Sequence, residues 1–217
     1  MISENLKKRI ITSILLFFLL ILIINYKPIF LYSLIVIGIF SIIEFNDLIK
    51  KIVKNINIKL IFNITFIIYL FIYCSVFFLL TNLIEFKIIL FSLLLSCIAS
   101  DIGGYIFGKT FKGPKISKIS PNKTYSGSLG SIVFCCIIFT GLIYLLTQNY
   151  NIILILTGLI VSVTCQLGDL FFSYLKRKAK KKDTGNFLPG HGGFLDRIDG
   201  ILFGVPIGFI FLLLFLT

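Results

Sequence analysis

The chain has 217 residues, of which 58% are hydrophobic and 15% aromatic, and its formal net charge at neutral pH is +12. Soluble domains contain fewer apolar residues and interrupt them with polar faces, so this composition excludes a soluble globular protein. It predicts an all-α fold, a polytopic helical bundle integral to a membrane. Membrane-spanning β-strands are not expected, because the apolar stretches are continuous rather than alternating.

Seven apolar stretches approach or exceed the roughly 20 residues that a helix needs to cross a bilayer. They cover residues 10–26, 28–45, 60–80, 86–108, 128–147, 152–172 and 199–216. No small-residue cleavage site follows the first stretch, so we expect a retained helix rather than a signal peptide. If the N-terminus is cytoplasmic, every basic residue except Lys27 and Lys87 falls on the cytoplasmic side, as the positive-inside rule requires.

The first part of the chain carries few motifs. We therefore divide the sequence into N-terminal transmembrane helices (1–85) and a catalytic membrane region (86–217) with cytoplasmic loops at 109–126 and 173–198. Glu44 and Asp47 are expected to face the lipid headgroups, and the basic segment 48–59 to form a cytoplasmic surface helix or a plain loop. The five cysteines form no C-x-x-C pair and are interpreted as small hydrophobic residues.

The fourth apolar stretch ends with polar residues. Asp101 lies within it, and an ionisable residue in a membrane span marks either a functional site or a paired structural charge. Asp101, Tyr105 and Lys109 follow one another at intervals of four residues and therefore share a helix face. Gly104 and Gly108 lie on an adjoining face, where small residues allow a second helix to approach closely.

The next loop combines basic residues with a glycine-rich helix start. Five lysines fall between residues 109 and 126, and the sequence S-G-S-L-G runs from Ser126 to Gly130. Ammonium groups and free backbone N–H donors suit phosphate binding. The order of a Walker P-loop is absent, and a loop that merely sets membrane orientation would also contain such lysines.

The sixth stretch carries a polar stripe made of Gln166, Asp169, Ser173 and Lys176. Within lipid, such a stripe must face protein or a watery cavity. After the Gly- and Pro-rich turn at 186–194, Asp196 and Asp199 are three residues apart and are expected on one face of the last helix.

Three carboxylates at the ends of two adjacent spans repel one another, so a hard divalent cation is the natural compensation. Asp169, Asp196 and Asp199 therefore predict a magnesium site. His191 lies in the turn before this helix and is either a structural hydrogen-bonding residue or a catalytic one.

The segment from Ser173 to Asp199 reads S-x-x-K-R-x-x-x-x-K-D-x-G-x-x-L-P-x-H-G-G-F-x-D-R-I-D. It resembles the signature of phosphatidate cytidylyltransferases, also called CDP-diacylglycerol synthases. Two further blocks resemble that family, D-x-x-G-Y-x-x-G-K from Asp101 and I-S-P-x-K-T from Ile119, as does the pair Gly168-Asp169. The resemblance covers the C-terminal half of the chain.

The resemblance implies transfer of the cytidylyl group of CTP to phosphatidate, giving CDP-diacylglycerol and diphosphate. The implied partners are CTP, phosphatidate and membrane lipids, without nucleic acid. The implied location is a bacterial-type cytoplasmic membrane, with the active site facing the cytoplasm. Magnesium is expected on Asp169 and Asp196 with Asp199 nearby, and a second monovalent or divalent cation is expected to bridge the phosphates.

The resemblance also gives expected roles to the basic and polar residues around these carboxylates. The nucleotide and triphosphate side is expected to be lined by Asp101, Lys109, Ser120, Lys123 and Thr124. From their charge and location, Lys176, Arg177 and Arg197 are expected to neutralise the lipid phosphate or the leaving diphosphate. Ser173 and His191 complete the expected substrate-binding residues.

Two positions depart from the family pattern. Phe172 and Ser126 stand where the family usually has acidic residues, and each change removes a candidate cation ligand or base.

The alternative functions are a CTP-dependent polyprenol kinase, which transfers the γ-phosphate, and an anion transporter, which would predict repeated halves with broken helices. The glycine-rich faces of the fourth and fifth stretches also suggest a homodimer.

Overall fold

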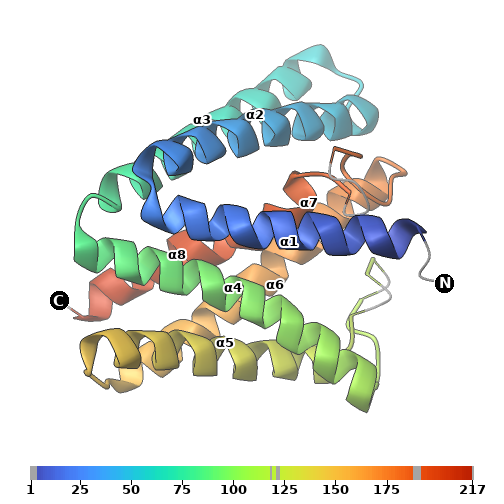
Figure 1. Cartoon of the computed structure of the whole chain (residues 1–217). Helices are drawn as coiled ribbons and strands as arrows, with labels where there is room; N and C mark the ends of the chain where they lie inside the picture. Colours follow the sequence, from blue (N-terminus) through green and yellow to red (C-terminus); the bar gives the residue numbers. More distant parts are fainter. Residues whose placement is uncertain (1–3, 118, 121–122, 188–191, 217) are drawn as a thin grey trace. The chain divides into compact units, whose positions relative to one another are not determined.

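The computed structural model describes residues 4–117, 119–120, 123–187 and 192–216. These residues form eight helices, together with one isolated antiparallel bridge between Lys115 and Thr124 (Figure 1). The helices are α1 (Glu4–Asn25), α2 (Lys27–Ile52), α3 (Ile56–Leu80), α4 (Ile84–Phe111), α5 (Tyr125–Thr147), α6 (Ile152–Lys178), α7 (Leu195–Ile198) and α8 (Ile201–Leu216). The predicted all-α fold is confirmed.

Within the described residues, six helical segments are long and apolar enough to cross a membrane. They are Lys27–Ile52, Ile56–Leu80, Ile84–Phe111, Tyr125–Thr147, Ile152–Lys178 and Leu195–Phe215. Large apolar side chains remain exposed along them, among them Phe71, Leu145 and Leu214, as expected of surfaces that face lipid. The protein is a polytopic helical membrane protein. The remaining predicted stretch, 10–26, corresponds to α1, which ends at Asn25 and whose side chains are only partly described.

The junction between α2 and α3 differs from the prediction. The segment 48–59 forms no separate surface helix or long loop, because α2 continues to Ile52 and α3 begins at Ile56. Leu48 and Ile49 lie in the core. Burial of these two apolar side chains favours continuation of the helix over a basic loop on the membrane surface.

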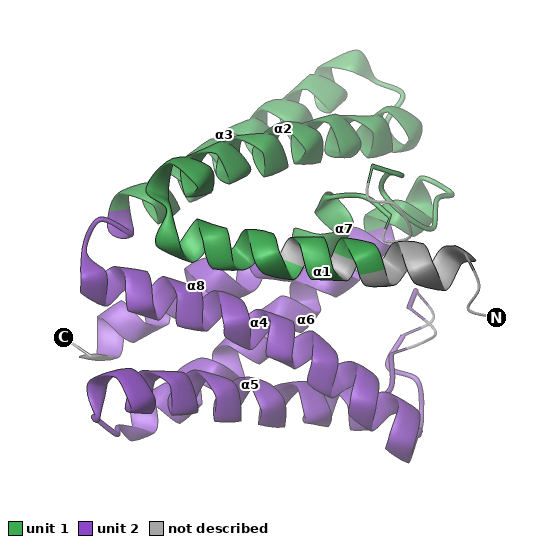
Figure 2. Ribbon diagram, in the orientation of Figure 1, with its two compact units in different colours: residues 1–79, 175–198 green, residues 80–174, 199–217 purple. Residues whose placement is uncertain are grey.

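The structure divides into two compact units (Figure 2). Unit 1 contains residues 1–79 and 175–198, and unit 2 contains residues 80–174 and 199–217. Helix α6 belongs to unit 2 up to Tyr174 and to unit 1 from Leu175 onward. The predicted division at residues 85 and 86 rested on motif content and remains a prediction.

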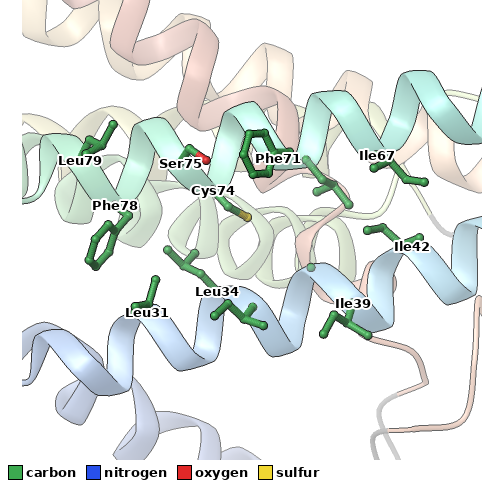
Figure 3. A pocket seen from close by; sticks show the side chains of 13 residues that line it. Leu31, Leu34, Ile39, Ile42, Ile67, Phe71, Cys74, Ser75, Phe78 and Leu79 are labelled. Atoms are coloured by element: carbon green, nitrogen blue, oxygen red, sulfur yellow. The ribbon is translucent and has the colours of Figure 1, made fainter.

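In unit 1, α2 packs against α1 and α7, and aromatic pairs connect it to α3. Phe45 stacks on Phe66 with a centroid distance of 3.9 Å, and Phe30 meets Phe77 at 5.6 Å. Between these two contacts lies an apolar pocket of about 520 Å³, with Leu34 of α2 and Phe71 of α3 on its walls (Figure 3). None of the described residues that line this pocket has an acidic or basic side chain.

In unit 2, α4 and α5 are in main-chain contact through glycines. A Cβ atom at Gly103 would lie 2.6 Å from the carbonyl oxygen of Gly130, and one at Gly127 would lie 2.8 Å from that of Gly104. The close helix approach predicted from the glycines therefore occurs within one chain, between α4 and α5. These glycine faces are covered, so they give the predicted homodimer no support.

Candidate active site

Helices α4, α5 and α6 of unit 2, with the loop before α5, enclose a polar cavity of about 250 Å³. Asp101 comes from α4 and Asp169 from α6, and they lie on the wall of the same cavity. The remaining lining residues are Gly104, Tyr105, Ile116, Ser120, Lys123, Thr124, Gly127, Ser128, Ser131 and Gln166. Four of the predicted substrate-binding residues thus lie together, namely Asp101, Ser120, Lys123 and Thr124.

The charged centre of this cavity is a pair of carboxylates beside a lysine. Ligand atoms of Asp101, Cys165 and Asp169 all lie within 4.8 Å of one another. Lys123 donates a hydrogen bond of 2.9 Å from Nζ to Asp169 Oδ2. Two carboxylates at this spacing can bind a divalent cation, and a lysine next to them can bind a phosphate oxygen.

Cys165 was not predicted at this site. It precedes Asp169 by one turn of α6, so the interval of four residues could have revealed that both side chains share a face. Its thiol is a soft ligand, whereas magnesium prefers oxygen, so the expected cation ligands remain the carboxylates. Cys165 is buried and all five cysteines of the chain are free thiols.

The chain around Asp199 packs tightly on α6. A Cβ atom at Gly200 would lie 2.7 Å from Asp169 Oδ1, and one at Gly168 would lie 2.6 Å from the carbonyl oxygen of Asp199. Gly200 also donates a backbone hydrogen bond of 3.0 Å to Asp199 Oδ1. The absence of side chains at Gly168 and Gly200 therefore brings the backbone of Asp199 next to the helix that carries Asp169.

A polar network connects the three helices around the cavity. Gln166 donates from Nε2 to Ser162 Oγ at 3.2 Å and accepts on Oε1 from Ser128 Oγ at 2.5 Å. Ser162 in turn lies 3.0 Å from Ser100, oxygen to oxygen. Gln166 and Asp169 of the stripe predicted on α6 thus both line the cavity, and Gln166 also contacts the neighbouring helices.

The start of α5 uses part of its hydrogen-bonding capacity itself. Thr124 is the N-cap residue, and its hydroxyl accepts from the backbone N–H of Gly127 at 3.2 Å. Ser126 donates to the carbonyl oxygen of Lys112. The sequence predicted that the backbone N–H groups of this stretch are free to bind phosphate. The capping interaction already occupies one of these N–H groups.

Lys109 does not line the cavity. Its Nζ lies 5.7 Å from the centroid of the Tyr105 ring, and the lysine is exposed. Asp101 and Tyr105 share the predicted helix face with it, but only these two reach the cavity wall.

A second cluster lies in unit 1 around Asp196 of α7. Lys176 donates from Nζ to Asp196 Oδ1 at 2.7 Å. Asp196 Oδ2 accepts from the backbone N–H of Thr184 at 2.8 Å and of Gly193 at 3.0 Å, and it lies 3.0 Å from the Thr184 hydroxyl. The Asp196 side chain is only 6% exposed.

Glu44 of α2 joins this second cluster. Its carboxylate accepts hydrogen bonds from the Thr184 hydroxyl at 2.6 Å and from the backbone N–H groups of Phe194 and Leu195 at 3.0 and 2.9 Å. Because Glu44 is buried, the expectation that it faces the headgroups is wrong. Asp47, by contrast, is exposed and lies 3.7 Å from Lys50.

The remaining predicted residues occupy varied environments. Ser173 is partly buried, Arg177 and Arg197 are exposed, and Arg177 donates to the carbonyl oxygen of Lys181. His191 lies outside the described residues. The expected common helix face of Asp196 and Asp199 is interrupted, because α7 ends at Ile198 and α8 begins only at Ile201.

The sequence model of the cytidylyltransferase family matches residues 3–215, nearly the whole chain. The chain belongs to the cytidylyltransferase family. It is 42% identical over 123 residues to a protein named phosphatidate cytidylyltransferase from Synechocystis sp., an alignment that covers 56% of this chain and 42% of the relative.

Proteins with the same name from Rickettsia bellii and Bacillus subtilis are 43% and 45% identical over 117 and 120 residues. Those alignments cover 50% and 54% of this chain, and 51% and 44% of the relatives. The chain thus spans about half the length of the curated relatives it matches.

The two departures from the family pattern have structural roles in this member. Phe172 is buried, and its ring meets those of Phe171 and Phe203 edge-on at 5.3 and 6.4 Å. Ser126 ties the start of α5 to the backbone of Lys112. Each position therefore contributes to packing or to loop structure, where the family pattern has an acidic residue.

Proposed function

We propose that this protein transfers the cytidylyl group of CTP to phosphatidate, giving CDP-diacylglycerol and diphosphate. The observation that carries the proposal is the cavity of unit 2, where Asp101, Asp169 and Lys123 meet. These residues fall in the blocks that resemble phosphatidate cytidylyltransferases, and the named relatives support the same reaction.

In this reaction an oxygen of the phosphatidate phosphate attacks the α-phosphorus of CTP. The bond from that phosphorus to the β-phosphate bridge oxygen breaks, and diphosphate leaves. Catalysis of such transfers depends on positioning and on stabilising negative charge. Lys123 is placed to bind a phosphate oxygen once it is released from Asp169, with Ser120 beside it on the cavity wall.

The carboxylates of the cavity fit a magnesium ion. Asp101 and Asp169 offer hard oxygen ligands within 4.8 Å of each other, which is the donor type that magnesium prefers. When bound there, magnesium would neutralise charge on the nucleotide phosphates. We propose Asp169 as the principal ligand and Asp101 as its partner in unit 2, and Asp199 remains a predicted ligand.

Asp196 differs from the other predicted ligands. Its Oδ2 atom already accepts from two backbone N–H groups and lies 3.0 Å from the Thr184 hydroxyl, and its Oδ1 atom pairs with Lys176. A cation could reach only Oδ1, and only after Lys176 has turned away. Roles of Asp196 in metal binding, and of Lys176, Arg177 and Arg197 in neutralising phosphates, remain predictions from the motif.

We further propose that the active site faces the cytoplasm of a bacterial-type membrane, because CTP is made there and the basic residues favour that orientation. A second cation and a homodimer remain predictions. The proposal needs no nucleic-acid partner.

The test uses the full chain, purified in detergent and incubated with phosphatidate, magnesium and CTP radiolabelled at the α-phosphorus. Label in the extracted lipid, lost on adding EDTA and lost in Asp169→Asn, is the expected result. A parallel reaction with γ-labelled CTP distinguishes the alternatives. Lipid label from γ-CTP alone would overturn the proposal in favour of a lipid kinase, and no lipid label from either would overturn both.

A further inference from the structure

Glu44 is an acidic residue buried in a membrane-spanning helix, in the half of the chain that the family motifs do not reach. Only 1% of its surface is exposed. Burial of a carboxylate is costly unless hydrogen-bond donors replace the lost water. Such a residue therefore needs a structural or functional reason, and its contacts supply one.

The donors to Glu44 come from the segment that carries Asp196. Two of them are the backbone N–H groups of Phe194 and Leu195, at the start of α7. N–H groups in the first turn of a helix have no partner within the helix, and they favour a negative charge. Glu44 therefore fixes the point at which α7 begins, one residue before Asp196.

Thr184 connects the two carboxylates directly. Its hydroxyl oxygen lies 2.6 Å from Glu44 Oε2 and 3.0 Å from Asp196 Oδ2, and its backbone N–H donates to Asp196 Oδ2. A hydroxyl carries one proton, so it donates to one carboxylate at a time. With the Thr184 hydroxyl proton donated to Glu44, the backbone N–H of Thr184 is the group that donates to the Asp196 carboxylate and fixes its Oδ2 atom.

Glycines allow the loop to lie directly on Glu44. A Cβ atom at Gly193 would overlap the Glu44 carboxylate and the Thr184 hydroxyl, and one at Gly185 would lie 2.5 Å from Glu44 Oε1. Both glycines belong to the motif that runs from Ser173 to Asp199. The motif thus closes around a side chain that lies 140 residues before Thr184 in the sequence.

We propose that Glu44 is a positioning residue that holds Thr184 and the start of α7, and through them orients the Asp196 carboxylate for the Lys176 side chain. The inference rests on the proposed function, because it assigns Glu44 a part in cytidylyl transfer. It adds a residue from the N-terminal helices to a site that the sequence motifs place entirely in the C-terminal half.

The experiment compares five variants of the full chain in detergent, four single substitutions and the double variant that combines Glu44→Gln with Thr184→Val. Glu44→Gln keeps the shape of the side chain but replaces one acceptor oxygen by an NH2 group. Thr184→Val removes the bridging hydroxyl, and Thr184→Ser restores it. Asp47→Asn is the matched control, because Asp47 lies on the same helix but is exposed and pairs only locally with Lys50.

Two readouts are measured on each variant. The first is kcat and KM for CTP in the cytidylyl-transfer assay. The second is hydrogen exchange at the backbone amides of Thr184, Gly193, Phe194 and Leu195, which does not depend on activity. Thermal unfolding of each variant checks that it is folded.

We expect Glu44→Gln and Thr184→Val each to lower kcat by at least about tenfold while KM for CTP changes less than about threefold. Combining them should lower kcat no further than the stronger single change, because both act through one contact. Exchange at the four amides should accelerate, and Thr184→Ser and Asp47→Asn should behave like the wild type.

The proposal is overturned if folded Glu44→Gln keeps wild-type kcat and amide exchange. It is also overturned if the effects of Glu44→Gln and Thr184→Val on kcat are additive. It is overturned too if Thr184→Ser fails to restore kcat. If Glu44→Gln does not fold, the kcat and amide exchange of Thr184→Val and Thr184→Ser test the proposal by the same criteria. A wild-type chain without transferase activity overturns the proposed function instead, and unchanged amide exchange in Glu44→Gln then excludes the positioning role independently.

Discussion

Asp169 in unit 2 and Asp196 in unit 1 come from the same family pattern, yet their surroundings are opposite. Asp169 lines a cavity, is 17% exposed and has its described hydrogen bond from Lys123. Asp196 is 6% exposed and has donors on both oxygens, including two backbone N–H groups. An aspartate in a motif can thus be open to a ligand or already saturated by its own loop, and the sequence pattern does not distinguish the two.

The largest difference should appear when each aspartate is replaced by asparagine. Asp169→Asn should lower cytidylyl transfer by on the order of 1,000-fold, or ~4 kcal/mol of transition-state stabilisation. Its thermal unfolding should change little, because the cavity leaves Asp169 partly hydrated. Asp196→Asn, in contrast, should lower the thermal stability of the protein. The amide NH2 group of the introduced asparagine would face hydrogen-bond donors. Equal melting temperatures for both variants would contradict the comparison.

The two lysines that pair with these aspartates sharpen the same contrast. Lys176→Met should destabilise the protein by about 3 kcal/mol, because it leaves the nearly buried Asp196 without its cationic partner. Lys123→Met should cost about 1 kcal/mol or less, since that ion pair is more exposed. Thermal or denaturant unfolding in detergent measures both changes in stability. A larger loss of stability for Lys123→Met than for Lys176→Met would contradict the contrast between the open Asp169 and the saturated Asp196.

A glycine substitution tests how tightly the Asp196 loop is packed. Gly193→Ala should destabilise the protein by about 2 kcal/mol, because the added methyl group overlaps Thr184 and Glu44. Gly38→Ala is the control in the same unit, because a Cβ atom there meets nothing within 4 Å. The packing argument fails if the two variants unfold at the same temperature.

The smallest effect is expected at the network around the open site. Ser128→Ala removes the hydrogen bond to Gln166 and should cost about 1 kcal/mol of stability. A modest rise in KM for CTP should accompany it, because both residues line the cavity. An unfolding curve measures the change in stability, and a CTP titration measures the change in KM. Wild-type values in both would show that the network contributes neither to stability nor to CTP binding.

Most of the fold follows from the sequence because membrane helices have a strong local signal. Continuous apolar stretches predicted the spans, but several helices extend beyond those stretches, as α2 does where Leu48 is buried. Asp101, Lys123 and Asp169 were also predicted, because charge within or beside an apolar span is conspicuous. Their meeting in one cavity needed the structure, since it depends on how three helices pack.

Glu44 shows what sequence reasoning could not supply. Its position near the end of an apolar stretch favoured an exposed headgroup contact, and no local pattern pointed to a partner 140 residues away. The pairing of Lys176 with Asp196 was not predicted either. The sequence analysis assigned Lys176 to phosphate binding and Asp196 to metal binding. Long-range hydrogen bonds between a helix and a distant loop leave no periodic trace.

The glycine contact between α4 and α5 has a mechanical consequence. Where two helices touch through their main chains, they cannot move closer, and moving apart would forfeit the whole contact. The distance between two walls of the unit 2 cavity is therefore set by backbone, whereas Tyr105 and Gln166 contribute side chains to its lining. If CTP binds in this cavity, as proposed, substitution of its side chains would change the shape of the nucleotide site and leave the width between α4 and α5 unchanged.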